Sequence, residues 1–305
     1  MVAGASSSIS SRTSRRSSTS DGRGLVRLTH PFPSLLNGLI ASAVAVAAGG
    51  GASTAVRLGL AMVALQVSIG TLNDLLDAER DAGRVPPKPI PGGLVDRRTA
   101  RAIWIGSAIL GLLLVIPSGL LTLAIAAAGL SIGYGYDRFA KGTAWSWLPF
   151  ALGIPLVPVY GWVGTGAPLP AAFAVLVPSA MLAGAALAIA NASADVEVDR
   201  ASGAASVAVR LGLRRAWVVH VALLGGALAI VLGTLFAAGA GSGATVIAVA
   251  GAGVVVCGAW LGATAGNRRS TPQQRVLGWE IEAVGMGILA TAWLVGLAGV
   301  TGPGQ

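Results

Sequence analysis

Long apolar segments are the feature of this sequence that most constrains its fold. Stretches of about 20 residues with almost no charge recur along the chain, and a helix of that length crosses the hydrocarbon core of a bilayer. The sequence is 54% hydrophobic and 11% charged, whereas a soluble domain of this length needs far more charge to cover its surface. We therefore expect an all-α, polytopic membrane protein with about nine transmembrane helices in a single bundle around a central cavity.

The candidate spans show little polarity of period 3.6, as expected for helices surrounded by lipid or by other helices. Three prolines in the fifth candidate, Pro149, Pro155 and Pro158, predict a kink, which a membrane helix tolerates when its neighbours satisfy the freed carbonyls. The candidate segments are 31–49, 55–73, 100–116, 119–136, 144–163, 170–191, 215–237, 244–265 and 276–299.

The basic residues alternate with these spans. With nine spans and the N-terminus inside, all of the 21 basic residues except Arg57 fall on the inner side. This distribution predicts that the N-terminus and the loops after spans 2, 4, 6 and 8 face the cytoplasm, in the cell membrane. A formal charge of +9 would suggest nucleic acid in a soluble protein. Between membrane spans it indicates topology signals and contact with anionic lipid or substrate, and we expect no nucleic-acid partner.

Two domains are predicted by the composition. Residues 1–27 read as a disordered, basic, Ser- and Arg-rich cytoplasmic tail, although organellar transit peptides share this composition and remain an alternative. Residues 28–300 form the transmembrane domain. The single cysteine, Cys257, excludes a disulfide within the chain and is expected to be inert packing.

Acidic residues gather at the inner ends of the second and sixth spans. These two clusters hold seven of the twelve acidic residues. The first cluster has the spacing i, i+3, i+7, which on a continuing helix places its members on one face: Asp74, Asp77 and Asp81. The second has the spacing i, i+4, i+8 and includes an amide: Asn191, Asp195 and Asp199. So many like charges at a helix end require a cation to neutralise them.

Oxygen ligands without His or Cys partners suit Mg²⁺ rather than zinc. Two facing clusters could hold two Mg²⁺ ions that clamp one diphosphate and offset the charge of a diphosphate leaving group. Basic residues that follow the helices could contact the same phosphates, namely Arg84, Lys88, Arg138 and Lys141. The alternative is a solvated inner loop whose acids merely balance neighbouring arginines. The occurrence of both clusters at equivalent helix ends favours a site.

The motifs around these clusters resemble those of the UbiA superfamily of intramembrane prenyltransferases. The first match is Asn73-Asp74-x-x-Asp77-x-x-x-Asp81, followed by Lys88-Pro89-Ile90-Pro91-Gly92. The second is Asp195-x-x-x-Asp199-x-x-x-Gly203. The resemblance covers about residues 28–300, with its specificity concentrated in the two motifs.

The resemblance implies that two Mg²⁺ ions bind an isoprenyl diphosphate through the five aspartates. The allylic carbon–oxygen bond would ionise, and an acceptor, commonly an aromatic ring, would capture the cation in an apolar tunnel that excludes water. It also implies substrate contacts from Asn73 and Asn191, from Asn37 in the first span, and from Tyr134, Tyr136, Asp137 and Lys141 after the fourth span. The basic residue that the family places after Gly203 is missing, and Arg210 is the candidate replacement.

Two other functions remain open. A terpene cyclase of the same fold would let the double bond of the substrate itself capture the cation. An ion-coupled transporter would use the acids for coupling, but transporters place such residues near the bilayer midplane rather than at helix ends. Outside the motifs, we expect Glu280 or Glu282 at headgroup level near Arg275, His220 in packing or an interfacial hydrogen bond, and His30 in solvent.

Overall fold

The computed structural model describes residues 21–84, 86–264 and 269–301, and the ordered elements in these ranges are helices. In chain order they are α1 (Gly22–Leu28), α2 (Pro31–Ala47), α3 (Ala52–Leu76), α4 (Arg97–Val115), η1 (Ile116–Ser118), α5 (Leu120–Gly135), η2 (Tyr136–Ala140), α6 (Leu148–Gly153), α7 (Leu156–Val163), α8 (Phe173–Ala194), α9 (Val196–Ala201), α10 (Val207–Leu211), α11 (Leu213–Ala237), α12 (Ser242–Leu261) and α13 (Pro272–Thr301).

Each predicted span coincides with a helix or a pair of helices. Seven helices in the described residues are long and apolar enough to cross a membrane, and the pair α1–α2, bent by 54°, raises the number to eight. The remaining candidate is the shorter apolar segment Leu148–Val163, in which Ile154 and Pro155 separate α6 from α7. The kink expected from the prolines is therefore present. The all-helical, multi-pass prediction is confirmed, with nine as an approximate number of spans.

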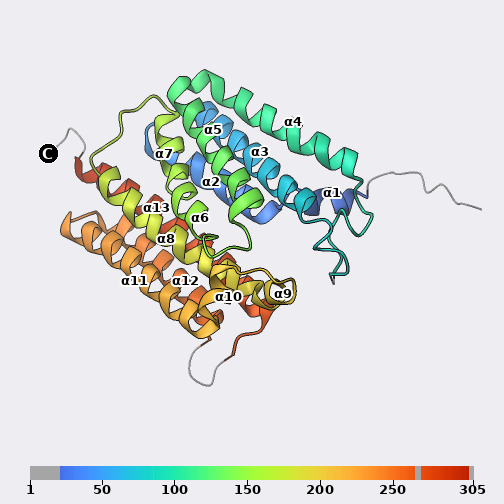
Figure 1. The fold of residues 1–305 in the computed structure, drawn as a ribbon. Helices are drawn as coiled ribbons and strands as arrows, with labels where there is room; N and C mark the ends of the chain where they lie inside the picture. The colour runs from blue at the N-terminus through green and yellow to red at the C-terminus, as the bar shows by residue number, and fades with distance from the viewer. Residues whose placement is uncertain (1–20, 85, 265–268, 302–305) are drawn as a thin grey trace, which may run out of the picture.

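The bundle has two halves that lie side by side (Figure 1). In the first half, α2 and α4 pack on α3, and in the second, α8 packs on α11 and α12 on α13. Helix α13 also contacts α8 and α2, and α6 contacts α8, so these helices join the halves. Each half has its own core of buried side chains. Leu58, Leu65 and Tyr160 belong to the first core, and Leu235, Leu289 and Trp293 to the second.

Glycine permits a close contact between α12 and α13 in the second half. A Cβ atom added to Gly258 of α12 would lie 2.6 Å from the Gly278 carbonyl oxygen of α13, and one added to Gly285 would lie 2.7 Å from the Val255 amide nitrogen. Both distances are shorter than carbon tolerates, so the two backbones could not approach this closely with any larger residue. Small residues serve the same purpose in membrane helix pairs generally, where close packing replaces the hydrophobic driving force.

The predicted disorder of residues 1–27 is wrong for its last part. Residues 1–20 lie outside the described residues, but α1 begins at Gly22, where Asp21 accepts a hydrogen bond from the Arg23 backbone amide at 3.1 Å. Leu28 at the end of α1 is fully buried and packs in one cluster with Ile90 and Val95. This apolar contact with a loop far along the chain orders the segment, and its local composition does not reveal it.

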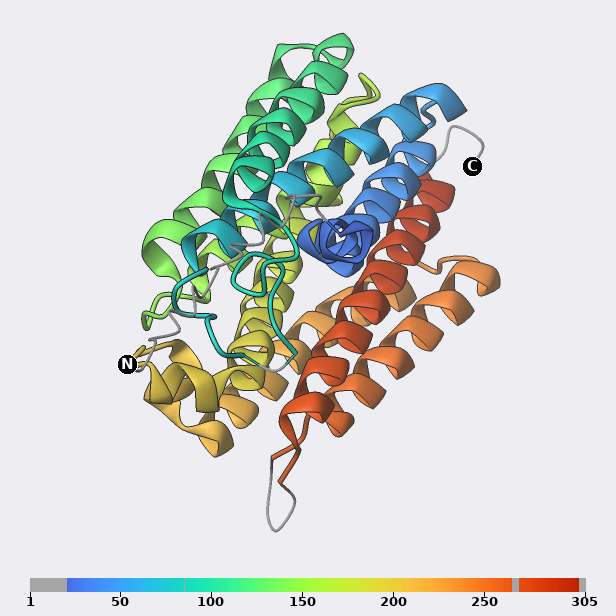
Figure 2. The same cartoon turned by 90° about the vertical axis from the view of Figure 1, so that its right-hand side faces the viewer.

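Both acidic clusters lie at the same end of the bundle. The helices α3 and α8 each run toward this end, which carries the connection from α3 to α4 and the short helices α9 and α10 (Figures 1 and 2). A backbone hydrogen bond of 2.8 Å from the Ala205 amide to the Gly142 carbonyl joins the loop after α9 to the loop after η2. The fold thus brings the two motifs from different halves to one face.

Candidate active site

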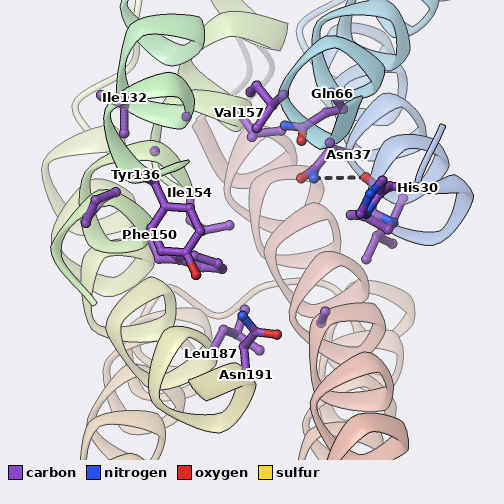
Figure 3. A pocket seen from close by; sticks show the side chains of 18 of the residues that line it. His30, Asn37, Gln66, Ile132, Tyr136, Phe150, Ile154, Val157, Leu187 and Asn191 are labelled. Atoms are coloured by element: carbon purple, nitrogen blue, oxygen red, sulfur yellow. Dashed lines mark hydrogen bonds between the residues drawn. The ribbon is translucent and has the colours of Figure 1, made fainter. Parts of the chain in front are cut away.

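A cavity of about 580 Å³ opens between the two halves. Its walls come from α2, α3, α5, α6, α7, α8 and α13, and its deeper part is apolar, with Leu65, Val157 and Leu176 among the lining side chains. Polar and charged residues of both motifs line the same cavity. Tyr136 and Phe150 face His30 and Asn37 across it, and Asn191 lies toward one end (Figure 3). The site therefore combines a charged end with an apolar chamber.

The first motif continues the line of α3 beyond the end of that helix. Asp77 is the C-cap residue of α3, and its amide donates to the Asn73 carbonyl at 3.0 Å, while the Asp81 amide donates to the Asp77 carbonyl at 2.8 Å. These bonds preserve helical spacing for one more turn. Asp77 and Asp81 consequently both reach the cavity, and both are buried.

Cations neutralise the carboxylates of the first motif. The ammonium group of Lys141, in the loop after η2, donates to Asp77, and Arg80 pairs with the same carboxylate at 2.9 Å. The Arg84 guanidinium lies 3.1 Å from Asp81 and 3.2 Å from Asp195. Because Asp195 directly follows α8 and belongs to the second motif, Arg84 connects the two clusters directly. Lys88 also lines the cavity.

Asp74 is the one aspartate of the two motifs that does not line the cavity. It is 2% exposed, and its Oδ1 atom lies 3.2 Å from Lys88 Nζ and 3.3 Å from His30 Nε2. His30 precedes α2 and has a φ of 46°, the one positive φ among the described residues other than glycine. Such a backbone conformation costs energy and persists only where its surroundings impose it. His30 therefore forms part of the cavity wall, whereas the sequence suggested only solvation.

The second motif has a more open setting. Helix α8 ends at Ala194, Asp195 occupies a junction between helices, and Asp199 lies one turn into α9. Asn191, Asp195 and Asp199 all line the cavity, as their shared face predicts. The Asp195 side chain is 50% exposed, compared with 11% for Asp77. The two motifs thus face one another across the cavity with unequal burial.

Of the two tyrosines that the resemblance implied as substrate contacts, one lines the cavity and the other does not. Tyr134 lies outside the cavity lining, with its hydroxyl 2.6 Å from Ser68 Oγ and its ring against Trp104. Tyr136 lines the cavity instead and packs edge-on against Phe150 at 5.3 Å between ring centroids. Tyr136 is the first residue of the π-type helix η2, whereas Tyr134 lies in the last turn of α5.

Two further predicted contacts fall outside the cavity. Arg138 is exposed, with its guanidinium 5.7 Å from the centre of the Phe139 ring, and Arg210 is exposed on α10. Neither lines the cavity, so Arg210 does not replace the basic residue missing after Gly203 in this arrangement. Asn37 and Asn73 do line it. Asn37 donates to the Pro33 carbonyl at 3.0 Å, and Asn73 donates to Asp137 at 2.8 Å.

The sequence predicted one of Glu280 and Glu282 at headgroup level near Arg275, and the structure shows what surrounds each of them. Glu280 lines the cavity from α13. Glu282 is 2% exposed, and its Oε1 atom lies 3.3 Å from Nε2 of His220, a buried residue of α11. The pairing of Glu282 with His220 joins residues far apart in the chain, and no local pattern signals it.

The donor set fits a hard cation that shares its ligands with a substrate. Among the described residues there is no group of three or more His, Cys, Asp or Glu side chains arranged to hold a metal. Mg²⁺ needs fewer, because it binds one or two carboxylates and takes its other ligands from phosphate oxygens and water. Carboxylates from two motifs at one cavity end meet that requirement, with Asp77, Asp81, Asp195 and Asp199 as the candidates.

Comparison with known proteins agrees with this architecture. The sequence profile of the UbiA prenyltransferase family matches residues 34–281. A digeranylgeranylglyceryl phosphate synthase of Halobacterium salinarum is 32% identical over 217 residues, which cover 68% of this chain and 76% of that protein. One from Korarchaeum cryptofilum is 30% identical over 148 residues, so the match spans 47% of this chain and about half, 51%, of that relative.

A solved structure has the same fold. The structure of a UbiA homolog from Archaeoglobus fulgidus bound to GPP and Mg²⁺ superposes with a TM-score of 0.68 and 19% identity. The alignment covers 87% of this chain and 99% of that protein. Both halves of the bundle therefore have counterparts in the known fold.

Proposed function

Because this chain belongs to the UbiA prenyltransferase family, we propose that it transfers a prenyl group from an isoprenyl diphosphate to a lipophilic acceptor within the membrane. The observation that carries the proposal is the meeting of two carboxylate motifs at one end of an apolar cavity, where Arg84 lies between Asp81 and Asp195. A diphosphate is the substrate group that such a mixture of carboxylates, metal and cations suits.

The charged end of the cavity is suited to the diphosphate. Asp77, Asp81, Asp195 and Asp199 would hold Mg²⁺, with two ions as our expectation from the two motifs. When bound, Mg²⁺ neutralises the diphosphate and stabilises it as a leaving group. The cationic side chains that also line this end would then donate to phosphate oxygens: Arg80, Arg84, Lys88 and Lys141.

Asp74 contacts two residues that line this end of the cavity. Its carboxylate contacts Lys88 and His30, which both line the cavity, whereas Asp74 itself does not. We therefore assign Asp74 the task of positioning these two residues, rather than the role of a direct metal ligand that the motif alone suggests.

The apolar chamber is suited to the prenyl chain. The allylic carbon–oxygen bond breaks, and the diphosphate leaves with the electron pair. The aromatic faces of Tyr136 and Phe150 in the cavity wall can stabilise the carbon cation until the acceptor attacks. Exclusion of water by the apolar walls protects the cation from hydrolysis.

The attacking atom of the acceptor must lose a proton when the new bond forms. Glu280 lines the cavity from α13, and no ion pair to its carboxylate is found in the described part of the chain. We assign Glu280 as the group that receives this proton. Glu280→Gln should lower kcat by roughly 100-fold, the usual contribution of a positioned general base, and leave the Mg²⁺ requirement unchanged. An undiminished kcat would exclude the assignment.

Two classes of acceptor deserve a direct comparison. The family resemblance suggests an aromatic ring, whereas the relatives named above are digeranylgeranylglyceryl phosphate synthases, a name that indicates a glycerol phosphate lipid. The names favour a lipid hydroxyl as the acceptor of this chain. Assays should therefore offer both an isoprenyl glyceryl phosphate and a hydroxybenzoate, and product formation from the aromatic acid alone would reverse this preference.

The charge distribution supports a sidedness. Arg80, Arg84, Lys88 and Lys141 lie with the motifs at one end of the bundle, while Arg57 hydrogen-bonds the Leu114 carbonyl and Ser118 at the α4–η1 junction, beside the start of α5. By the positive-inside rule, the motif end faces the cytoplasm and the protein belongs in the cell membrane. Protease accessibility of this end in inside-out vesicles tests that orientation.

The experiment that tests the activity uses purified protein in lipid nanodiscs. It should consume an allylic diphosphate only when both Mg²⁺ and acceptor are present, and Asp199→Asn should lower kcat/KM by about 100-fold or more. Release of diphosphate without any acceptor, accompanied by a cyclised hydrocarbon, would instead indicate a terpene cyclase. Solute flux into vesicles without diphosphate turnover would indicate a transporter.

A further inference from the structure

The second motif contains an acid that does not face the cavity. Glu197 lies between Asp195 and Asp199 on α9, but it is not among the residues that line the cavity. Both of its carboxylate oxygens accept hydrogen bonds from Arg275 Nη2, at 2.6 and 2.5 Å. Arg275 belongs to the first turn of α13, 78 residues further along the chain. Glu197 is therefore directed away from the diphosphate and toward a different helix.

We propose that Arg275 is a positioning residue for the second motif, which holds Glu197 so that Asp195 and Asp199 on either side of it face the cavity. This inference rests on the proposed function, because it concerns how the diphosphate end of the same site is assembled. It also assigns Glu197 a role distinct from that of its acidic neighbours, namely an anchor rather than a ligand.

Arg275 is suited to this task because it is buried and is held by the segment just before its own helix. It is 4% exposed, and its Nη1 atom donates to the Ser270 carbonyl at 2.7 Å. A buried guanidinium held in this way has little freedom to swing, whereas a surface arginine would have to be ordered first. The carboxylate that it binds is about half exposed, so α13 supplies the buried partner and α9 the exposed one.

A buried polar cluster surrounds Arg275 and extends its support into the bundle. Arg275, Glu282, Trp217 and His220 border a cavity of about 20 Å³. His220 Nδ1 lies 2.9 Å from the Ala186 carbonyl oxygen of α8, and His220 Nε2 lies beside Glu282. Helices α8, α11 and α13 thus meet at one polar node. A volume of this size accommodates one water molecule, for which N–H groups and a carboxylate are suitable partners.

The short helix α9 needs such an anchor. It has six residues, and its N-cap residue makes no side-chain capping bond. One side chain, Val196, is fully buried, in a cluster with Val207 and Ala216. A helix this short does not hold its shape alone. The buried valine fixes one end of α9, and the contact with Arg275 fixes its rotation, which decides where Asp199 points.

The test measures the docking of α9 by limited trypsin digestion in detergent without Mg²⁺. Arg200 is exposed at the end of α9 and provides the cleavage site, while the exposed Arg138 in the other half reports on the rest of the fold. Glu197→Ala and Arg275→Met should each raise cleavage after Arg200 by about tenfold or more, the effect of losing a charged hydrogen bond, and leave cleavage after Arg138 unchanged.

The variants control one another. Glu197→Ala alters a half-exposed residue and should fold even if Arg275→Met does not, and the double variant should be cut no faster than the faster single one. Arg275→Lys, which keeps the charge, should restore part of the protection. Arg269→Met, which changes an exposed arginine six residues away, should behave like the wild type. Unchanged cleavage after Arg200, or equal acceleration at both sites, would overturn the proposal.

A second measurement separates positioning from general damage. Both single variants should raise the Mg²⁺ concentration for half-maximal turnover by about tenfold, with KM for the acceptor unchanged. An equal loss at all Mg²⁺ concentrations would contradict a positioning role. If the wild type instead makes no prenylated product, the proposed function fails, while the digestion result still shows whether Arg275 anchors α9.

Discussion

The two carboxylate motifs have the same residue types but different surroundings. In the first, the Asp77 and Asp81 side chains are 11% and 5% exposed and each is paired with cations. In the second, the Asp195 side chain is 50% exposed, and it pairs with Arg84, which follows the first motif. The first motif is thus held in place by its own half of the protein, whereas the second depends on partners from elsewhere.

This difference indicates that the two motifs contribute differently to stability and to activity. A buried carboxylate with fixed cationic partners keeps its position without a ligand. If that carboxylate is removed, its buried cationic partners are left without a counter-charge, which is destabilising. An open carboxylate gains most from the metal and diphosphate. We therefore expect changes in the first motif to reduce both stability and activity, and changes in the second to reduce activity alone.

The largest expected effect comes from removing one carboxylate of each motif. Asp77→Asn and Asp199→Asn should each lower kcat/KM by about 100-fold or more, as losses of electrostatic stabilisation at a reacting centre do. Only Asp77→Asn should also lower Tm, because Lys141 and Arg80 lose their counter-charge. Kinetics and thermal unfolding of the same preparations test the comparison, and equal Tm losses would refute it.

Arg84 should have the next largest effect because it links the motifs. Arg84→Met removes the contacts to Asp81 and Asp195 and one phosphate donor, so KM for the diphosphate should rise by roughly tenfold. Arg98→Met, an exposed residue on α4, serves as the control and should have no effect. A normal KM for the Arg84 variant would show that the motifs do not share a ligand through this residue.

Asp74 should have a smaller effect than the other motif aspartates. Since it contacts Lys88 and His30 but does not line the cavity, Asp74→Asn should raise KM for the diphosphate severalfold, on the order of a weakened charged hydrogen bond, and leave the Mg²⁺ dependence intact. If Asp74→Asn changed the Mg²⁺ dependence as much as Asp77→Asn does, Asp74 would be a metal ligand. Its assignment as a positioning residue would then be wrong.

The smallest effect is expected at the far end of the loop that follows the first motif. Asp96 caps α4 by accepting from the Arg98 and Thr99 amides, whereas α9 and α10 after the second motif begin without a side-chain cap. Hydrogen bonds from Thr99 hold the pKa of Asp96 below its ordinary value. Its stabilising contribution is therefore present above that ordinary value, about 3.9, and is lost as pH falls through the lower value of the folded protein.

Thermal unfolding as a function of pH checks this cap. Asp96→Ala should lower Tm slightly at neutral pH without changing KM, because the capping bonds are lost far from the cavity. Asp96→Asn keeps a capping side chain and should flatten the acid dependence of Tm. An acid dependence that persists unchanged in Asp96→Asn would assign it to other carboxylates.

The sequence predicted the spans and the meeting of the motifs because both depend on patterns that are local and strong. Hydropathy marks a span through its length, and the positions of basic residues then fix which helix ends share a face. The helical spacing predicted that Asp77 and Asp199 reach one cavity, and both line it, because backbone hydrogen bonds of helical type run from Asp81 to Asp77 and from Asp199 to Asp195. The break between α6 and α7 was predicted from Pro155, because proline interrupts the hydrogen bonds of a helix locally.

The remaining features depend on contacts that spacing does not encode. Tyr134 and Tyr136 are two residues apart and therefore point in different directions from a helix, and their spacing does not say which of the two reaches the cavity. Asp74 shares a helix face with Asp77, yet His30 and Lys88 draw its carboxylate away. Glu282 pairs with His220 and Glu197 pairs with Arg275 across the bundle, so no local pattern in the sequence predicts either contact.

The most direct test of the central claim is metal-directed cleavage of the backbone. Fe²⁺ replaces Mg²⁺ in the presence of an allylic diphosphate analogue, and radicals generated at the metal with ascorbate and peroxide cut the nearby chain. The account predicts cuts both around Asp77–Asp81 and around Asp195–Asp199, each suppressed by excess Mg²⁺. Cleavage at one motif only would show that the two motifs do not bind the same metal–diphosphate complex and would contradict the account.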